Sequence, residues 1–187
     1  MKIILASASS RRYEILKNFG YDIEVVPSCF DENINGLLYS DFLVVDCAYQ
    51  KALDVKNRIG DNILIVSADT VVVNNGIVLG KPKDKLEAIN ILSGLSGKTH
   101  FVASAICLMH KGQIVKDVEK TFVTFKKISQ ENIINYINEK HPYDKAGSYG
   151  IQDENFDFVE KINGELDNVI GFPMKLFKKK LTQIKLN

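Results

Sequence analysis

The sequence lacks the marks of a disulfide-stabilised or zinc-binding domain. Its cysteines, Cys29, Cys47 and Cys107, lie far apart, and no two of them form a CxxC pair. An odd number of scattered cysteines favours reduced thiols in a cytosolic protein. The three histidines share no metal-ligand spacing either, so we expect no zinc site.

Long apolar runs are also absent. No segment reaches the ~18 consecutive apolar residues that a membrane-spanning helix needs. The apolar stretch near the N-terminus, residues 3–6, is shorter than the core of about 7–15 residues found in a secretory signal. We therefore expect a cytoplasmic protein with no membrane partner.

Charge of neither sign is in excess. Lys and Arg total 24 and Asp and Glu total 23, so the formal net charge is +1. A nucleic-acid-binding domain usually carries a clear basic excess, so we expect no stable nucleic-acid partner. The basic stretch "KLFKKKLTQIK" is interpreted as a solvated helix end, where cations are favoured by the helix dipole. Any binding of phosphate groups must then come from local clusters.

The 187 residues fit one domain spanning 1–187, since no repeat, low-complexity tract or linker divides them. Apolar periodicity and turn signals predict strands and helices that mix without strict βαβ alternation. We therefore predict an α/β or α+β fold with a long mixed sheet. The expected strands are residues 2–6, 22–27, 62–73, 77–82, 156–163 and a hairpin over 99–128. The expected helices are 10–20, 40–60, 84–97, 129–140 and 165–184, the last interrupted near Gly171 and Pro173. Ser40, Asp84 and Ser129 are expected to cap three of them, and "NNG" at 74–76 predicts a hairpin turn.

The stretch "LASASSRR" joins the first expected strand to the first expected helix. Free N–H groups and the positive dipole end make a helix N-terminus an anion site, to which Ser7, Ser9 and Ser10 add hydroxyl donors. Arg11 and Arg12 can fork onto phosphate oxygens. This stretch equally supports a second interpretation, in which the serines cap the helix and the arginines face water. It is neither a Walker loop nor GxGxxG, so no named motif decides between the two.

Further charged candidates are scattered along the chain. Asp69 follows one apolar run and precedes another, so we expect it near a strand end, where a carboxylate can hold Mg²⁺ against a phosphate. Lys81, between a glycine and a proline, can reach a phosphate, and Glu32 and Lys51 are weaker candidates. Taken singly, each has a simpler interpretation as a turn aspartate, a hairpin-end lysine or a solvated charge.

The stretch "YDKAGSYGIQ" is glycine-bearing and loop-like. Gly147 and Gly150 permit close approach or unusual dihedral angles. Tyr149 can stack on a base, and Gln152 offers both a donor and an acceptor to a base edge. A plain surface loop explains the stretch equally well.

Considered together, these residues suit a metal–triphosphate substrate that carries a base. Phosphoryl chemistry needs charge neutralisation, an in-line nucleophile and positioning. The arginines, lysines, carboxylates and amide supply the corresponding groups. No Ser-His-Asp or Cys-His arrangement competes with this interpretation.

The sequence resembles the Maf family of nucleoside triphosphate pyrophosphatases, also named septum formation inhibitor proteins. The stretches "ILASASSRRYEIL", "SADTVVVNNGIVLGKP", "DKAGSYGIQ" and "NVIGFP" carry the resemblance, in order and over nearly the whole chain. It implies hydrolysis of a nucleoside triphosphate to the monophosphate and pyrophosphate with Mg²⁺ or Mn²⁺. It also implies a homodimer and an elongated mixed sheet flanked by helices, with two lobes around a central cleft, similar to inosine triphosphatases.

The resemblance also implies roles for individual residues. Asp69 would be the catalytic proton acceptor or a metal ligand, and Glu32 an acidic metal-site residue. The phosphate-handling residues would be Ser7, Arg12, Lys51 and Lys81. Arg11, Thr70 and Gln152 stand at the positions that sort the subfamilies, and they look like the branch acting on dTTP and UTP.

Three departures from the family pattern are visible. Asp153 and Glu154 follow "GIQ" where many relatives have glycine, which can alter the loop or add acidic oxygens near the site. Phe172 replaces a leucine, which we interpret as packing, and Gln50 stands where a relative can have glutamate.

Three other functions stay open at this point. The chain can be a regulator of septum formation that binds nucleotide without hydrolysing it, which would show no pyrophosphate release. It can prefer 7-methyl-GTP or another modified nucleotide. A nucleic-acid binder is opposed by the near-neutral charge and would show strongly salt-dependent binding.

Overall fold

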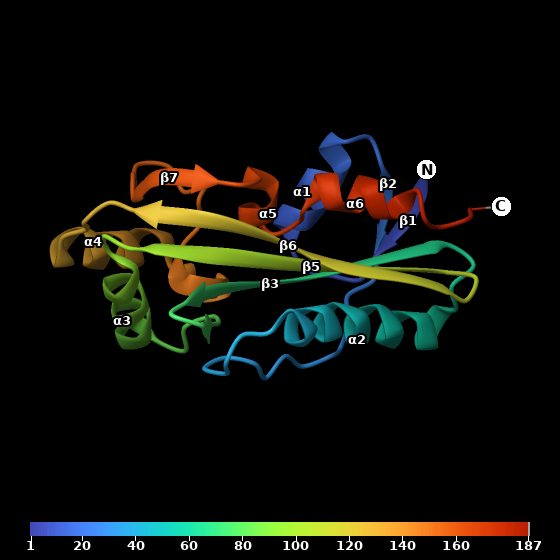
Figure 1. Cartoon of the computed structure of the whole chain (residues 1–187), viewed down its shortest axis with the longest axis horizontal. Helices are drawn as coiled ribbons and strands as arrows, with labels where there is room; N and C mark the ends of the chain where they lie inside the picture. The colour runs from blue at the N-terminus through green and yellow to red at the C-terminus, as the bar shows by residue number, and fades with distance from the viewer. Residues whose placement is uncertain (187) are drawn as a thin grey trace.

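The computed structural model describes residues 1–186, which form one long twisted sheet with helices packed on both faces (Figure 1). Asn187, the last residue of the predicted domain, lies outside the described residues. The sheet has seven strands in the order β2-β1-β3-β5-β6-β7, and β4 pairs with β3 outside this path. The strands are β1 (Lys2–Leu5), β2 (Asp22–Val25), β3 (Leu64–Asn74), β4 (Ile77–Leu79), β5 (Thr99–His110), β6 (Gln113–Phe125) and β7 (Val159–Asn163).

The sheet is mixed, as the sequence predicts. β1 runs parallel to both β2 and β3, whereas the β3–β5, β5–β6 and β6–β7 pairs are antiparallel. The expected hairpin turn at 74–76 is confirmed, with Asn75 and Gly76 both at positive φ. β2 and β4 end earlier than expected, each before a proline, which has no N–H to donate to a ladder.

The helices begin where the sequence offers caps. They are α1 (Ser10–Asn18), α2 (Asp41–Ile59), α3 (Lys85–Leu95), α4 (Gln130–Lys140), α5 (Leu166–Ile170) and α6 (Met174–Leu181), with 3₁₀ turns η1 (Pro142–Asp144) and η2 (Ala146–Ser148). Ser40, Asp84 and Ser129 accept hydrogen bonds from backbone N–H groups three residues on, as predicted for N-caps. The expected interruption of the C-terminal helix lies between α5 and α6, where Gly171 has a φ of 125°.

Two lobes share the sheet (Figure 1). The terminal lobe holds β1, β2, α1 and α6, and the distal lobe holds α3, α4, η1, η2 and β7. β3, β5 and β6 are long enough to run through both lobes. Three apolar clusters fill the space between sheet and helices: one under α1 and α6, one under α2, and one between β5 and α3 and α4. The predicted mixed fold with two lobes is therefore confirmed.

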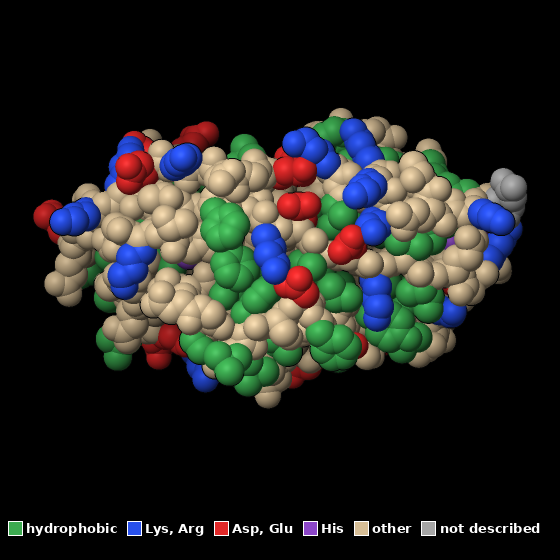
Figure 2. All heavy atoms as spheres, in the orientation of Figure 1, with side chains coloured by type: hydrophobic (Ala, Val, Ile, Leu, Met, Phe, Trp, Pro, Cys, Tyr) green, Lys and Arg blue, Asp and Glu red, His purple; other side chains and the backbone are tan. Residues whose placement is uncertain are grey.

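Charged side chains of both signs lie close together over the middle of the molecule (Figure 2). This region is where the two lobes meet. Within residues 1–186, none of the helices combines the length and apolarity needed to cross a membrane.

Candidate active site

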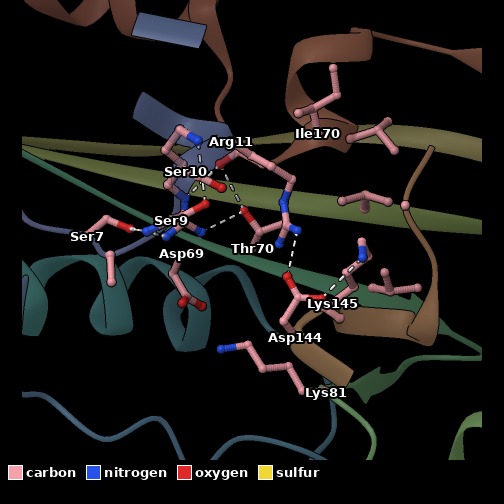
Figure 3. A pocket seen from close by; sticks show the side chains of 18 of the residues that line it. Ser7, Ser9, Ser10, Arg11, Asp69, Thr70, Lys81, Asp144, Lys145 and Ile170 are labelled. Atoms are coloured by element: carbon pink, nitrogen blue, oxygen red, sulfur yellow. Dashed lines mark hydrogen bonds and ion pairs between the residues drawn. The ribbon is translucent and has the colours of Figure 1, made fainter. Parts of the chain in front are cut away.

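A cavity of about 400 Å³ opens between the two lobes (Figure 3). Its walls come from the β1–α1 turn, α2, β3, the loops at 28–32 and 80–81, the segment 144–152 and the end of α5. All nine site residues that the family resemblance implies line it: Ser7, Arg11, Arg12, Glu32, Lys51, Asp69, Thr70, Lys81 and Gln152. The fold thus gathers into one space side chains from almost the whole length of the chain.

The serine-rich turn forms where the chain leaves the sheet after β1. Ser9 caps α1, and its Oγ accepts a hydrogen bond from Arg12 N. Ser7 is buried, and its Oγ accepts from Ser9 N at 3.2 Å. Ser9 therefore caps the helix, as the second interpretation of "LASASSRR" expects, but both arginines bond to protein groups and do not simply face water. The three serines also line the cavity, where an anion could reach them.

The guanidinium of Arg12 lines the cavity and is fixed by three hydrogen bonds. Its Nε donates to the Gly171 carbonyl at 3.0 Å, Nη1 to Ser7 Oγ at 3.1 Å and Nη2 to Thr70 Oγ1 at 3.2 Å. Burial lowers the pKa of Arg12, and the nearby carboxylates of Asp69 and Glu32 oppose that shift. The guanidinium keeps its charge regardless, since arginine is not deprotonated in proteins. These three bonds leave two of its five N–H groups for a ligand.

Arg11 points to the opposite wall. Its Nη1 lies 2.9 Å from Asp144 Oδ2, which belongs to η1 in the distal lobe (Figure 3). This exposed ion pair is the direct charged contact between the β1–α1 turn and the distal wall of the cavity. Two adjacent arginines therefore do different things, one fixed inside the terminal lobe and one bridging to the distal lobe.

The carboxylates are organised around a buried lysine. Lys51 of α2 places its Nζ 2.6 Å from Asp69 Oδ1 and also forms an ion pair with Glu32. Asp69 lies in the middle of β3, opposite Ala105, and not near a strand end as expected, because β3 continues through both apolar runs. It is 1% exposed, and its Oδ2 has no hydrogen-bond partner within the described residues. An orphaned buried carboxylate oxygen is costly unless a cation or proton donor completes it.

The pKa values of Asp69 and Glu32 are shifted in opposite directions from their usual range. Burial raises the pKa of Asp69, and the neighbouring negative charge of Glu32 adds to the rise, while the ammonium of Lys51 opposes it. Burial would also raise the pKa of Glu32, but Lys51, Asp69 and Lys81 together lower it to about 2. Asp69 is thus the better proton acceptor of the pair at neutral pH.

The oxygen donors suit a hard divalent cation that is shared with a substrate. Among residues 1–186, no group of three or more His, Cys, Asp and Glu side chains could hold a metal. Mg²⁺, however, commonly takes one or two carboxylates and completes its shell with water and phosphate oxygens. Glu32 and the unpartnered Asp69 Oδ2 fit that requirement.

The remaining walls hold the other predicted residues. Lys81 follows Gly80, whose N–H donates to Asn35 Oδ1 at 2.8 Å and so fixes the loop that carries the lysine. Thr70 Oγ1 shares a hydrogen bond with Ser104 Oγ at 2.8 Å and lies 3.2 Å from the Gly171 carbonyl. Gln152 is exposed at the rim.

Two charged residues of the lining, Asp144 and Lys145, are not among those predicted from the sequence. Both lie in "DKAGSYGIQ", where only the glycines, the tyrosine and the glutamine gave a chemical reason for attention. Of the two effects expected of Asp153, the structure shows the one on the loop: Asp153 accepts a hydrogen bond from Tyr136 and does not line the cavity. Phe172 packs in the core against Phe177, as interpreted.

Comparisons with known proteins show which family the chain resembles over nearly its full length. The family described as Maf-like protein matches residues 2–184. A dTTP/UTP pyrophosphatase of Clostridium perfringens is 46% identical over 182 residues, covering 95% of each chain. A dTTP/UTP pyrophosphatase of Pyrococcus abyssi is 47% identical over 174 residues, covering 93% of this chain and 91% of the other. Among solved structures, a nucleoside-triphosphatase / dITP/XTP pyrophosphatase of Mycobacterium abscessus matches with a TM-score of 0.48 and 14% identity, covering 100% of both chains.

Proposed function

We propose, from the premise that the chain belongs to the Maf family, that it hydrolyses nucleoside triphosphates to the monophosphate and pyrophosphate, with dTTP and UTP as substrates. The observation that carries this is identity over nearly the full length to dTTP/UTP pyrophosphatases. The cavity supports it, because it holds cationic and hydroxyl donors beside the buried carboxylate of Asp69 and the more exposed one of Glu32. Water attacks the α-phosphorus, the α–β phosphoanhydride bond breaks, and pyrophosphate leaves.

The terminal-lobe side of the cavity binds the phosphates in this proposal. Ser7, the start of α1 and the two free N–H groups of Arg12 supply hydrogen-bond donors on a fixed frame. Lys81 adds a positive charge from the loop after β4. Donors that are already held in place need no reorganisation when charge develops in the transition state.

The carboxylate side handles the cation and the water. Glu32 would hold Mg²⁺ or Mn²⁺, joined by Asp69 if that residue acts as a ligand and not as the base; when bound, the cation neutralises triphosphate charge and polarises a phosphoryl oxygen. Lys51 keeps Asp69 in one orientation by binding Oδ1, so that Oδ2 is the atom left for a proton or a ligand. The raised pKa of Asp69 favours its use as proton acceptor for the attacking water.

Base selection is assigned to Arg11, Thr70 and Gln152. The Gln152 amide offers a donor and an acceptor, which match the carbonyl and N–H edge shared by uracil and thymine. Its place at the rim leaves it free to meet a base while the triphosphate lies deeper. We further propose that the protein works as a homodimer in the cytoplasm.

The test is pyrophosphate release from a panel of canonical and modified triphosphates, with Mg²⁺, with Mn²⁺ and with chelator. We expect the highest kcat/KM for dTTP and UTP, and loss of activity with chelator. A clear preference for 7-methyl-GTP would overturn the base assignment. Saturable nucleotide binding without any pyrophosphate release would identify a non-catalytic binding protein instead.

A further inference from the structure

Tyr136 of α4 does not line the cavity, but its hydroxyl bonds to the turn that carries Gln152. The Tyr136 hydroxyl accepts a hydrogen bond from Gly150 N at 2.9 Å and donates one to Asp153 Oδ2 at 2.5 Å. Asp153 N in turn donates to the Gly150 carbonyl at 3.0 Å. Gly150 and Asp153 flank residues 151 and 152, so one hydroxyl joins both ends of the turn that presents the glutamine.

Gly150 allows the carboxylate to lie against this turn. A Cβ built at Gly150 would come within 2.7 Å of Asp153 Oδ2, a distance that no side chain tolerates without a shift. Lys145, which lines the cavity, has its Nζ 3.9 Å from the same oxygen. The turn is thus closed by contacts that depend on the pair Tyr136 and Asp153.

The tyrosine itself has little freedom. Tyr136 is 1% exposed, and its ring packs edge-on against Phe156 at 4.9 Å and Phe158 at 5.0 Å between centroids. The side chain of Gln152 is less restrained than that of Tyr136, since it makes no hydrogen bond within residues 1–186. The backbone of the turn therefore determines where the amide can reach.

We propose that Tyr136 and Asp153 are positioning residues for base selection: they hold the turn at 150–153 so that the Gln152 amide meets the edge of a pyrimidine. The inference rests on the proposed function, because it gives Gln152 a base to read. Neither residue of the pair lines the cavity, so neither contacts the triphosphate. Their effect is on the base and not on the phosphates.

The central experiment compares wild type with Tyr136→Phe, which keeps the packed ring and removes the hydroxyl. We expect KM for UTP and dTTP to rise about tenfold, because losing a buried hydrogen bond commonly weakens binding by about that factor. The value of kcat should stay within about twofold. The inhibition constant of tripolyphosphate, which has no base, should not change. A merely structural role would not separate these readouts.

Asp153 variants sharpen the assignment. Asp153→Ala should raise KM as Tyr136→Phe does, whereas Asp153→Asn keeps an acceptor oxygen and should recover most of the wild-type KM. The double variant Tyr136→Phe, Asp153→Ala should be no worse than either single one, because both changes break the same contact. Tyr21→Phe is the matched control, since Tyr21 packs against Phe177 away from the cavity lining.

Two results would overturn the proposal. One is an equal shift in KM for UTP and in the inhibition constant of tripolyphosphate; the other is an unchanged KM in Tyr136→Phe. If wild type releases no pyrophosphate from any triphosphate, the proposed function fails separately. Calorimetric titration with α,β-methylene-UTP then still tests the pair: about tenfold weaker binding by Tyr136→Phe supports it, and equal binding contradicts it.

Discussion

The two ends of the cavity are built differently. At the terminal-lobe end, Arg12 is partly buried and bonded to Ser7, Thr70 and the Gly171 carbonyl, and Asp69 is buried against Lys51. At the distal end, Gln152 is exposed and Arg11 meets Asp144 in an exposed ion pair. The terminal-lobe end therefore holds its charged groups in fixed positions before a substrate binds. The distal end relies on a turn and on surface charges, which suits recognition of a variable base.

This contrast predicts that changes at the buried end reduce kcat and that changes at the exposed end affect KM. The largest expected effect is at Asp69. Asp69→Asn keeps an oxygen facing Lys51 but removes the proton acceptor, so kcat should fall about 10²–10⁴-fold while the far-ultraviolet circular dichroism stays unchanged. Substantial activity in folded Asp69→Asn would refute the assignment.

A second effect is expected at Arg12. Lysine cannot reproduce the fork, so Arg12→Lys should lower kcat/KM about 100-fold and the free energy of unfolding by about 1–3 kcal/mol, because Thr70 and the Gly171 carbonyl lose a donor. Steady-state kinetics and urea unfolding measure the two parts. Arg58→Lys is the control, since Arg58 forms an exposed ion pair with Asp54. Equal effects of both changes would contradict the prediction.

The distal end should be sensitive to acid. His100 lies 2.8 Å from the Tyr149 hydroxyl, and burial lowers its pKa to about 4. Between pH ~6.5 and 4 the unfolded chain takes up a proton that the folded chain does not, so the free energy of unfolding falls as pH drops. The loss should be about 2 kcal/mol at pH 5, measured by urea unfolding. His100→Gln should abolish this part of the pH dependence; the same slope in both proteins would place its origin elsewhere.

The smallest effect is expected from breaking the exposed ion pair between Arg11 and Asp144. Asp144→Asn removes the partner of Arg11, but a solvated ion pair contributes about 0–1 kcal/mol, so the unfolding free energy should barely change. KM for UTP should change by only a few-fold, with kcat constant. Lys2→Gln, which breaks the exposed pair with Glu24, serves as the control. A large fall in kcat would show that the bridge belongs to the catalytic end.

The sequence was informative where chemistry is local. Caps at Ser40, Asp84 and Ser129 and the turn at 74–76 depend on neighbouring residues, and the structure has them as predicted. The mixed sheet followed from pattern, but the place of β1 between β2 and β3 did not, because parallel pairing leaves no local signal.

For the site, the sequence predicted residues that carry an obvious chemical group, but it did not predict residues whose role depends on a partner far away in the chain. Arg11 and Asp144 are 133 positions apart, and Tyr136 reads as an ordinary core residue of an amphipathic helix. No periodicity or turn rule connects such pairs. Asp153 departs visibly from the family pattern, but the sequence holds no signal that its carboxylate bonds to Tyr136 and stays outside the cavity lining.

The continuous sheet limits how a substrate can enter. β3 and β5 pair without a break from Ile65 and Met109 to Val73 and Phe101, across the boundary of the two lobes. A hinge motion there would have to rupture several ladder hydrogen bonds at once, so the continuous sheet resists opening of the two lobes. For a nucleotide bound in the cavity, we therefore expect entry and pyrophosphate release to depend on the side chains and loops at the rim.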